Sequence, residues 1–282
     1  KRSAQTRTGS CPSRKTMMMW SIRMASTSSR LCRTCPFIGS NYRWAREGTF
    51  LMTRHDLSTS ARPGGIQPIP PTSMNEDMAM GIQDATRMYV RHGMGKKRLE
   101  NISNDTKSTL VTRWQRMMEA FLGTQVHVLA GLGYAPDEKG LALYNQQLGM
   151  FLQDCGPDLQ EIFRIKGRDT WRYVLATAFD LEVDTFQELT IVDARNIMHK
   201  VSLKMQDPQI LDKISKKCAQ VDPSDNPQVE MASKHNVVQE VLVNDVYMSG
   251  NPSLVEECGF GEGDAGYVRM QCIMSEHQGD PL

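Results

Sequence analysis

The sequence predicts an all-α protein: a single irregular helical bundle of about six to eight helices, with a basic extended N-terminal arm and an irregular C-terminal tail. Apolar residues recur every three or four positions through several segments, and Gly and Pro mark the turns between them. Residues 1–65 hold 12 Lys and Arg but only 2 Asp and Glu, whereas the remaining residues hold 21 basic and 30 acidic ones. The arm and the body are therefore different kinds of polypeptide.

The domain division follows these changes of composition. We predict a basic, presequence-like arm over residues 1–63, a Pro-rich linker over residues 64–72, a helical domain over residues 73–250 and an irregular acidic tail over residues 251–282. The hydrophobic content of 40% is that of a globular protein. No run approaches the roughly 20 apolar residues that a membrane-spanning helix needs, so we predict no transmembrane segment and leave peripheral membrane contact open.

The arm has the composition of an organelle address. It is rich in Arg, Ser and Thr, is nearly free of acid and lacks the apolar core of a secretory signal. This favours a mitochondrial transit peptide, with a plastid address and a retained basic arm as alternatives. Cys32 and Cys35 form a C-x-x-C pair, for which coincidence, half of a zinc site and a redox pair stay open. A second such pair and a βαβ context are both lacking.

The helical domain begins with a helix capped by Ser73 that runs to about His92 and ends at Gly93. A basic cluster, Lys96 to Arg98, follows in what we predict to be a loop. A solvated turn is one interpretation of this cluster, and contact with a phosphate or a lipid headgroup is the other.

The centre of the bundle is predicted between Asp105 and Phe186. A first core helix starts after residues 103–105, and a second begins at Asp137 and stops before residues 155–157. A short third helix ends at Gly167, and a fourth opens near residue 169. Their apolar stripes include the aromatic residues Trp114, Phe121, Tyr144, Phe151, Phe163, Trp171 and Phe179.

Capping patterns predict the helices beyond the core. A near capping box at residues 184–187 opens a helix that runs to about Met205. Pro208 and Pro227 each occupy a first helical position, where proline is well tolerated. Residues 237–247 are rich in β-branched side chains, but their apolar spacing also suits a helix, which we predict.

No arrangement in the sequence identifies a reaction. P-loop, zinc-protease and serine-hydrolase motifs do not occur, and His127 is predicted to be a hydrogen-bonded core residue. Residues 261–266 match the dinucleotide-binding glycine pattern, but Glu262 and Asp264 would repel a phosphate and no strand precedes them. We therefore predict that the protein is not an enzyme and has no catalytic, cofactor-binding or metal-binding residue.

These observations predict a non-catalytic accessory subunit of a large mitochondrial inner-membrane energy-converting complex, ATP synthase or the respiratory chain, on the matrix side. Its partners would be other subunits, and nucleic acid only if the basic arm is retained. One alternative is a mitochondrial ribosomal protein whose arm contacts RNA. The other is a helical enzyme or a lipid- or cofactor-binding protein, with a cavity lined by Trp114, Phe121, Tyr144, Phe151 and Trp171.

Overall fold

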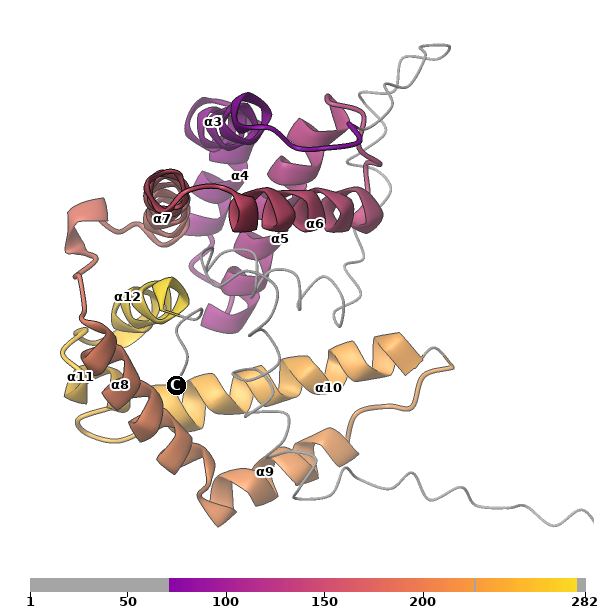
Figure 1. The fold of residues 1–282 in the computed structure, drawn as a ribbon. Helices are drawn as coiled ribbons and strands as arrows, with labels where there is room; N and C mark the ends of the chain where they lie inside the picture. Colours follow the sequence, from indigo (N-terminus) through magenta and orange to yellow (C-terminus); the bar gives the residue numbers. More distant parts are fainter. Residues whose placement is uncertain (1–70, 226, 278–282) are drawn as a thin grey trace, which may run out of the picture.

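A computed structural model describes residues 71–225 and 227–277 of the protein (Figure 1). Within these residues the chain is largely helical and forms no β-strand, only one isolated bridge. The predicted all-α class is therefore confirmed. The predicted arm over residues 1–63, including Cys32 and Cys35, lies outside the described residues, as does most of the predicted linker.

The described residues contain ten α-helices, a short 3₁₀ helix (η1) and a π-helix (η2), more elements than the sequence predicted. Figure 1 labels the α-helices. In chain order the elements are α3 (Glu76–His92), α4 (Met94–Ser103), α5 (Leu110–Ala130), α6 (Glu138–Asp154), α7 (Pro157–Phe179), η1 (Val183–Thr185), α8 (Ile191–Met205), α9 (Pro208–Ala219), α10 (Pro227–Val241), η2 (Leu242–Tyr247), α11 (Leu254–Glu257) and α12 (Gly263–Glu276).

Side-chain caps define several helix starts. Asn75 caps α3, two residues after the predicted Ser73, and its Oδ1 accepts a backbone N–H at 2.9 Å. Thr109 caps α5 and Asp137 caps α6 in the same way. The start of α6 therefore confirms the prediction, whereas α5 begins later than predicted.

The basic cluster Lys96 to Arg98 lies within helix α4, so its prediction as a loop was wrong. Gly93 ends α3, but the chain turns and continues at once as α4 because Leu99 and Ile102 are buried against the core. Gly95 permits the close approach of α4 to α5, because a Cβ there would lie 2.8 Å from Oγ1 of Thr124.

The predicted third and fourth core helices are one helix, α7, which passes through Gly167 without a break. Packing explains the difference, because α7 lies against α3, α4, α5 and α12. This burial outweighs the cost of about 1 kcal/mol for a glycine inside a helix. Asp180 follows the last residue of α7, and its left-handed φ of 54° turns the chain away.

Two boundaries after the core also differ from the prediction. The near capping box at residues 184–187 does not start α8; this stretch forms η1 and an extended segment instead. The capping box of α8 is formed by Thr190 and Asp193, a pairing of Thr with Asp rather than with Glu or Gln. Residues 237–247 are helical as predicted, with a widened π pattern from Leu242 to Tyr247.

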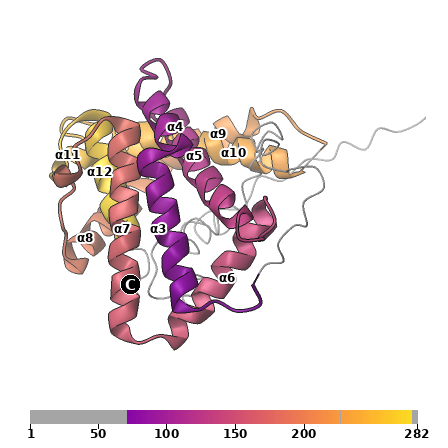
Figure 2. The same ribbon diagram turned by 90° about the horizontal axis from the view of Figure 1, so that it is seen from above.

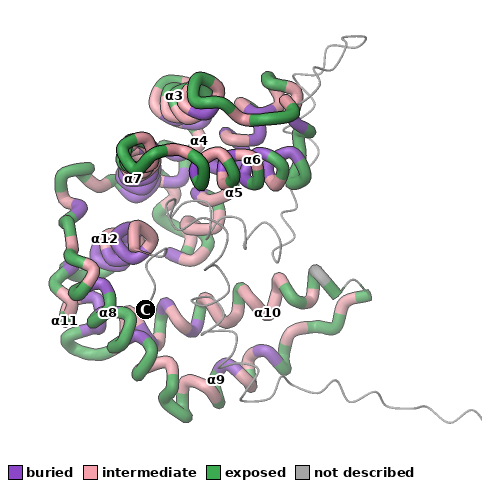
Figure 3. The backbone as a smooth tube through the Cα atoms, viewed as in Figure 1, coloured by how far each residue is buried: buried purple, intermediate pink, exposed green. Residues whose placement is uncertain are grey.

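The predicted irregular tail over residues 251–282 was wrong for its described part, which forms α11 and α12. Figure 3 shows α12 as largely buried. The glycine and acid content of residues 256–264 suggested a tail, but this stretch comprises the end of α11, a short turn and the first residues of α12. The buried residues of this helix are Gly266, Tyr267, Val268, Met270, Cys272, Ile273 and Met274. The packing unit therefore extends beyond the predicted boundary at residue 250.

Three clusters of buried side chains hold the bundle together. The first joins α3, α5, α6 and the start of α7, and the second joins α4, α5 and α7 to α8, η2, α11 and α12. α3 and α7 run side by side in the same direction (Figure 2), since Asp84 pairs with Lys166 and Arg91 lies over the ring of Tyr173. The third cluster, between α9 and α10, is much smaller.

Candidate functional site

Titratable side chains that could perform chemistry are dispersed. No three His, Cys, Asp or Glu side chains of the described residues gather closely enough to hold a metal ion. His127 is exposed on α5 and stacks on Tyr89, with ring centroids 4.8 Å apart, so its prediction as a core residue was wrong. Its neighbour Val126 occupies the buried face of the helix instead. The absence of catalytic, cofactor-binding and metal-binding residues stays a prediction.

The cysteine thiols of α12 and of the turn before it are poor nucleophiles. Burial raises the pKa of both Cys258 and Cys272, so each remains a protonated thiol at neutral pH. The thiolate is the reactive form of cysteine. Cys272 contacts Oε1 of Glu276, with its sulfur 3.7 Å away. These thiols therefore serve packing.

The five aromatic residues predicted to line one cavity belong to two separate packed clusters. Trp114, Phe121 and Trp171 contact one another, with centroid distances of 5.7 Å and 6.2 Å from the Trp171 ring to the rings of Phe121 and Trp114. Tyr144 and Phe151 belong to the other cluster. The predicted shared cavity was wrong because α6 and the C-terminal part of α7 contribute to different clusters.

A groove of about 650 Å³ does open elsewhere, between α4 and the C-terminal end of α7. Leu181 and Val183 provide an apolar side wall. The charged, amide and hydroxyl side chains of its lining are Lys97, Glu100, Asn101, Ser103, Asn104, Tyr173, Thr177 and Asp180. The lining is mostly polar, unlike the apolar pockets that hold lipids and aromatic cofactors.

Two helix C-termini meet at this groove, because α4 ends at Ser103 and α7 ends at Phe179. The N–H groups of Asp180 and Leu181 both donate to the carbonyl oxygen of Ala176. The carbonyl groups of the last three residues of α7 therefore have no backbone hydrogen bond within the described part. Helix C-termini carry partial negative charge, so this end of the groove favours a cation.

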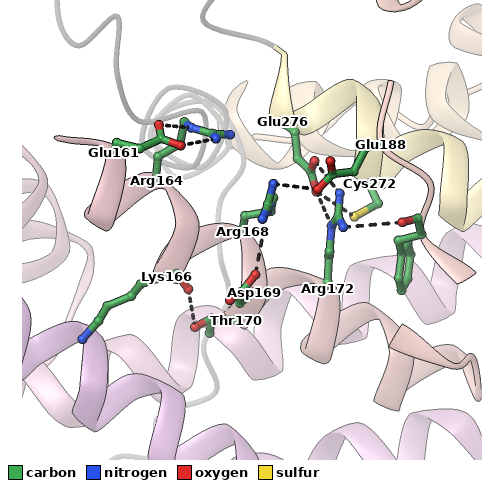
Figure 4. A network of polar contacts seen from close by, with 11 residues as sticks. Glu161, Arg164, Lys166, Arg168, Asp169, Thr170, Arg172, Glu188, Cys272 and Glu276 are labelled. Atoms are coloured by element: carbon green, nitrogen blue, oxygen red, sulfur yellow. Dashed lines mark hydrogen bonds and ion pairs between the residues drawn. The ribbon is translucent and has the colours of Figure 1, made fainter. Parts of the chain in front are cut away.

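A second polar arrangement lies along α7. Arg164, Arg168 and Arg172, here called the arginine row, occupy successive turns of the helix, and Figure 4 shows a carboxylate beside each. Arg164 pairs with Glu161, and Arg168 pairs with Glu188 at 3.2 Å. The Arg164 guanidinium, which donates to Glu161, lowers the pKa of that carboxyl group.

Arg172 makes the most buried ion pair of the row. Its Nε and Nη2 donate to the two carboxylate oxygens of Glu276 at 2.7 Å and 2.8 Å, and both side chains are about nine-tenths buried. On the neighbouring residues, Nε1 of Trp171 donates to Oγ of Ser275 at 3.1 Å. Bidentate geometry fixes orientation as well as distance. The pair therefore locks α12 onto α7.

The outward face of α8 is the third feature. Val192 and Leu203 are 60% and 55% exposed, and they lie eleven residues apart, close to three helical turns of about 3.6 residues. Both point away from the buried side of the helix, which carries Ala194, Ile197 and Val201. Asn196 and His199, both exposed, lie between them on the same face, so Val192 and Leu203 are two separate apolar contacts on a mixed surface and do not form a continuous apolar patch.

No protein family model, curated protein or solved structure matches this chain. Among the described residues, no helix has both the length and the apolar content needed to cross a membrane.

Neither the groove nor the arginine row was predicted from the sequence. The row was visible as Arg at every fourth position from 164 to 172, but the helix break predicted at Gly167 hid its continuity. The groove had no signal in the sequence, because its walls are residues 97–104 and 173–183, which only the fold brings together.

Proposed function

We propose that this protein is a non-catalytic accessory subunit of a large mitochondrial assembly, an inner-membrane energy-converting complex, and lies on its matrix side. The observation that carries this proposal is the outward face of α8, which presents the apolar side chains of Val192 and Leu203 to solvent among polar residues. In the isolated chain, more than half of the surface of Val192 and of Leu203 stays in contact with water. A neighbouring subunit would cover this apolar surface.

The surroundings of this face support a protein partner. Lys200 and Lys204 flank it, and neither has an ion pair within the described residues. Apolar side chains within a polar, charged rim are the usual composition of a subunit interface.

The mitochondrial part of the proposal is supported by composition. Residues 1–63 combine Arg, Ser and Thr with few acidic residues, as mitochondrial presequences do. ATP synthase and the respiratory chain are the assemblies that we propose, and the mitochondrial ribosome is the alternative that the same composition allows.

Sedimentation tests this proposal directly. Mitochondria from cells that carry a tagged copy of the full chain are solubilised in mild detergent and separated on a density gradient. We expect the tag to co-migrate with ATP synthase or with a respiratory complex. Co-migration with the ribosome would favour the alternative, and a free monomer would overturn both assignments.

A matched pair of variants tests the surface. The double substitution V192S/L203S changes the outward face of α8, and the control M88S/M150S changes two similarly exposed side chains on α3 and α6. We expect the first variant to leave the assembly while keeping its circular dichroism spectrum, and the control to stay bound. Equal behaviour of the two variants would remove the role assigned to α8.

A further inference from the structure

We draw no further inference here: the strongest candidate, the arginine row of α7, carries nothing because a carboxylate of Glu161, Glu188 or Glu276 already pairs with each of its guanidinium groups, which leaves no free charge for a ligand.

Discussion

Helix α12 and the α9–α10 hairpin lie in the same C-terminal part of the described chain, yet they are held in different ways. α12 packs into the large cluster with α7, and its Val268, Met270 and Ile273 are fully buried. In the hairpin, the buried cluster consists of Ile214, Cys218 and Val241. Figure 3 shows this difference as a buried α12 beside a hairpin with much exposed surface.

Their ion pairs differ in the same sense. Arg172 and Glu276 are about nine-tenths buried where α12 meets α7. In the hairpin, Lys217 and Glu240 are 37% and 50% exposed and 3.5 Å apart. Exposed pairs contribute little because water and salt screen them, whereas a buried pair that loses one member leaves a desolvated charge. The inner helix is therefore fixed by packing and charge together, and the hairpin is free to serve as a surface.

The largest expected effect comes from breaking the buried pair. We expect Arg172→Met to lower the free energy of unfolding by about 3–5 kcal/mol, because Glu276 is then buried without a partner. Urea unfolding followed by circular dichroism measures this loss. The double variant R172M/E276M should recover most of it.

The matched control is Lys217→Met in the hairpin, which removes the exposed partner of Glu240. We expect a cost of about 1 kcal/mol or less. If the two single variants were equally destabilised, the contrast between the inner helix and the hairpin would be lost.

Two core truncations give the next largest effect. Ile273→Ala in α12 should lower the free energy of unfolding by about 2–5 kcal/mol and shift the urea midpoint of the whole domain. Ile214→Ala in α9 opens a much smaller cluster, so we expect the loss to be mainly local. Hydrogen exchange should then quicken in α9 and α10 alone. A global loss for the second variant would contradict the separation of the two regions.

The smallest effect concerns two carboxylates, Glu256 in α11, which contacts α12, and Glu230 in the hairpin. The Ser253 hydroxyl and backbone N–H lower the pKa of Glu256 at the start of α11, and the Lys234 ammonium lowers that of Glu230 in α10. Each contributes stability above its unfolded pKa near 4.5, and that stability is lost as pH falls through the lower folded pKa. Urea midpoints of Glu256→Gln and Glu230→Gln should therefore fall slightly at pH 7 and match the parent below about pH 3.

Salt separates these two carboxylates. In about 0.5 M NaCl the effect of Glu230→Gln should fade, because its ion pair with Lys234 is exposed and screened. The effect of Glu256→Gln should persist, because the carboxylate accepts the N–H of Ser253 at 2.7 Å. Equal salt sensitivity would show that the two environments do not differ.

The sequence predicted those parts of the fold that depend on local patterns. Both ends of α6 were predicted correctly, because Asp137 caps its start and residues 155–157 end it. α12 was missed, because its buried face includes Gly266 and Cys272, and the glycines before it suggested a tail. The continuity of α7 was missed because tertiary packing, which propensity does not contain, decides whether a helix passes through Gly167.

The candidate site was less predictable than the fold. The groove joins residues about 75 positions apart in the sequence, and the polar residues that line it are common on any exposed helix. The cap that shapes its end depends on Asp180 in a left-handed conformation, which Asn and Asp adopt only occasionally. Such a site becomes visible only when α4 and α7 are placed together.

The position of α12 also sets an order of events during biosynthesis. Trp171 and Arg172 find their partners 104 residues later in the chain, at Ser275 and Glu276. Synthesis proceeds from the N-terminus, so α3 to α7 emerge before α12 is available. The face of α7 that carries Trp171 and Arg172 therefore stays uncovered until α12 has been synthesised. A nascent chain that stopped before residue 263 would lack α12 and would leave this face of α7 exposed to chaperones and proteases. Incomplete chains would thereby be distinguished from complete α12-containing ones.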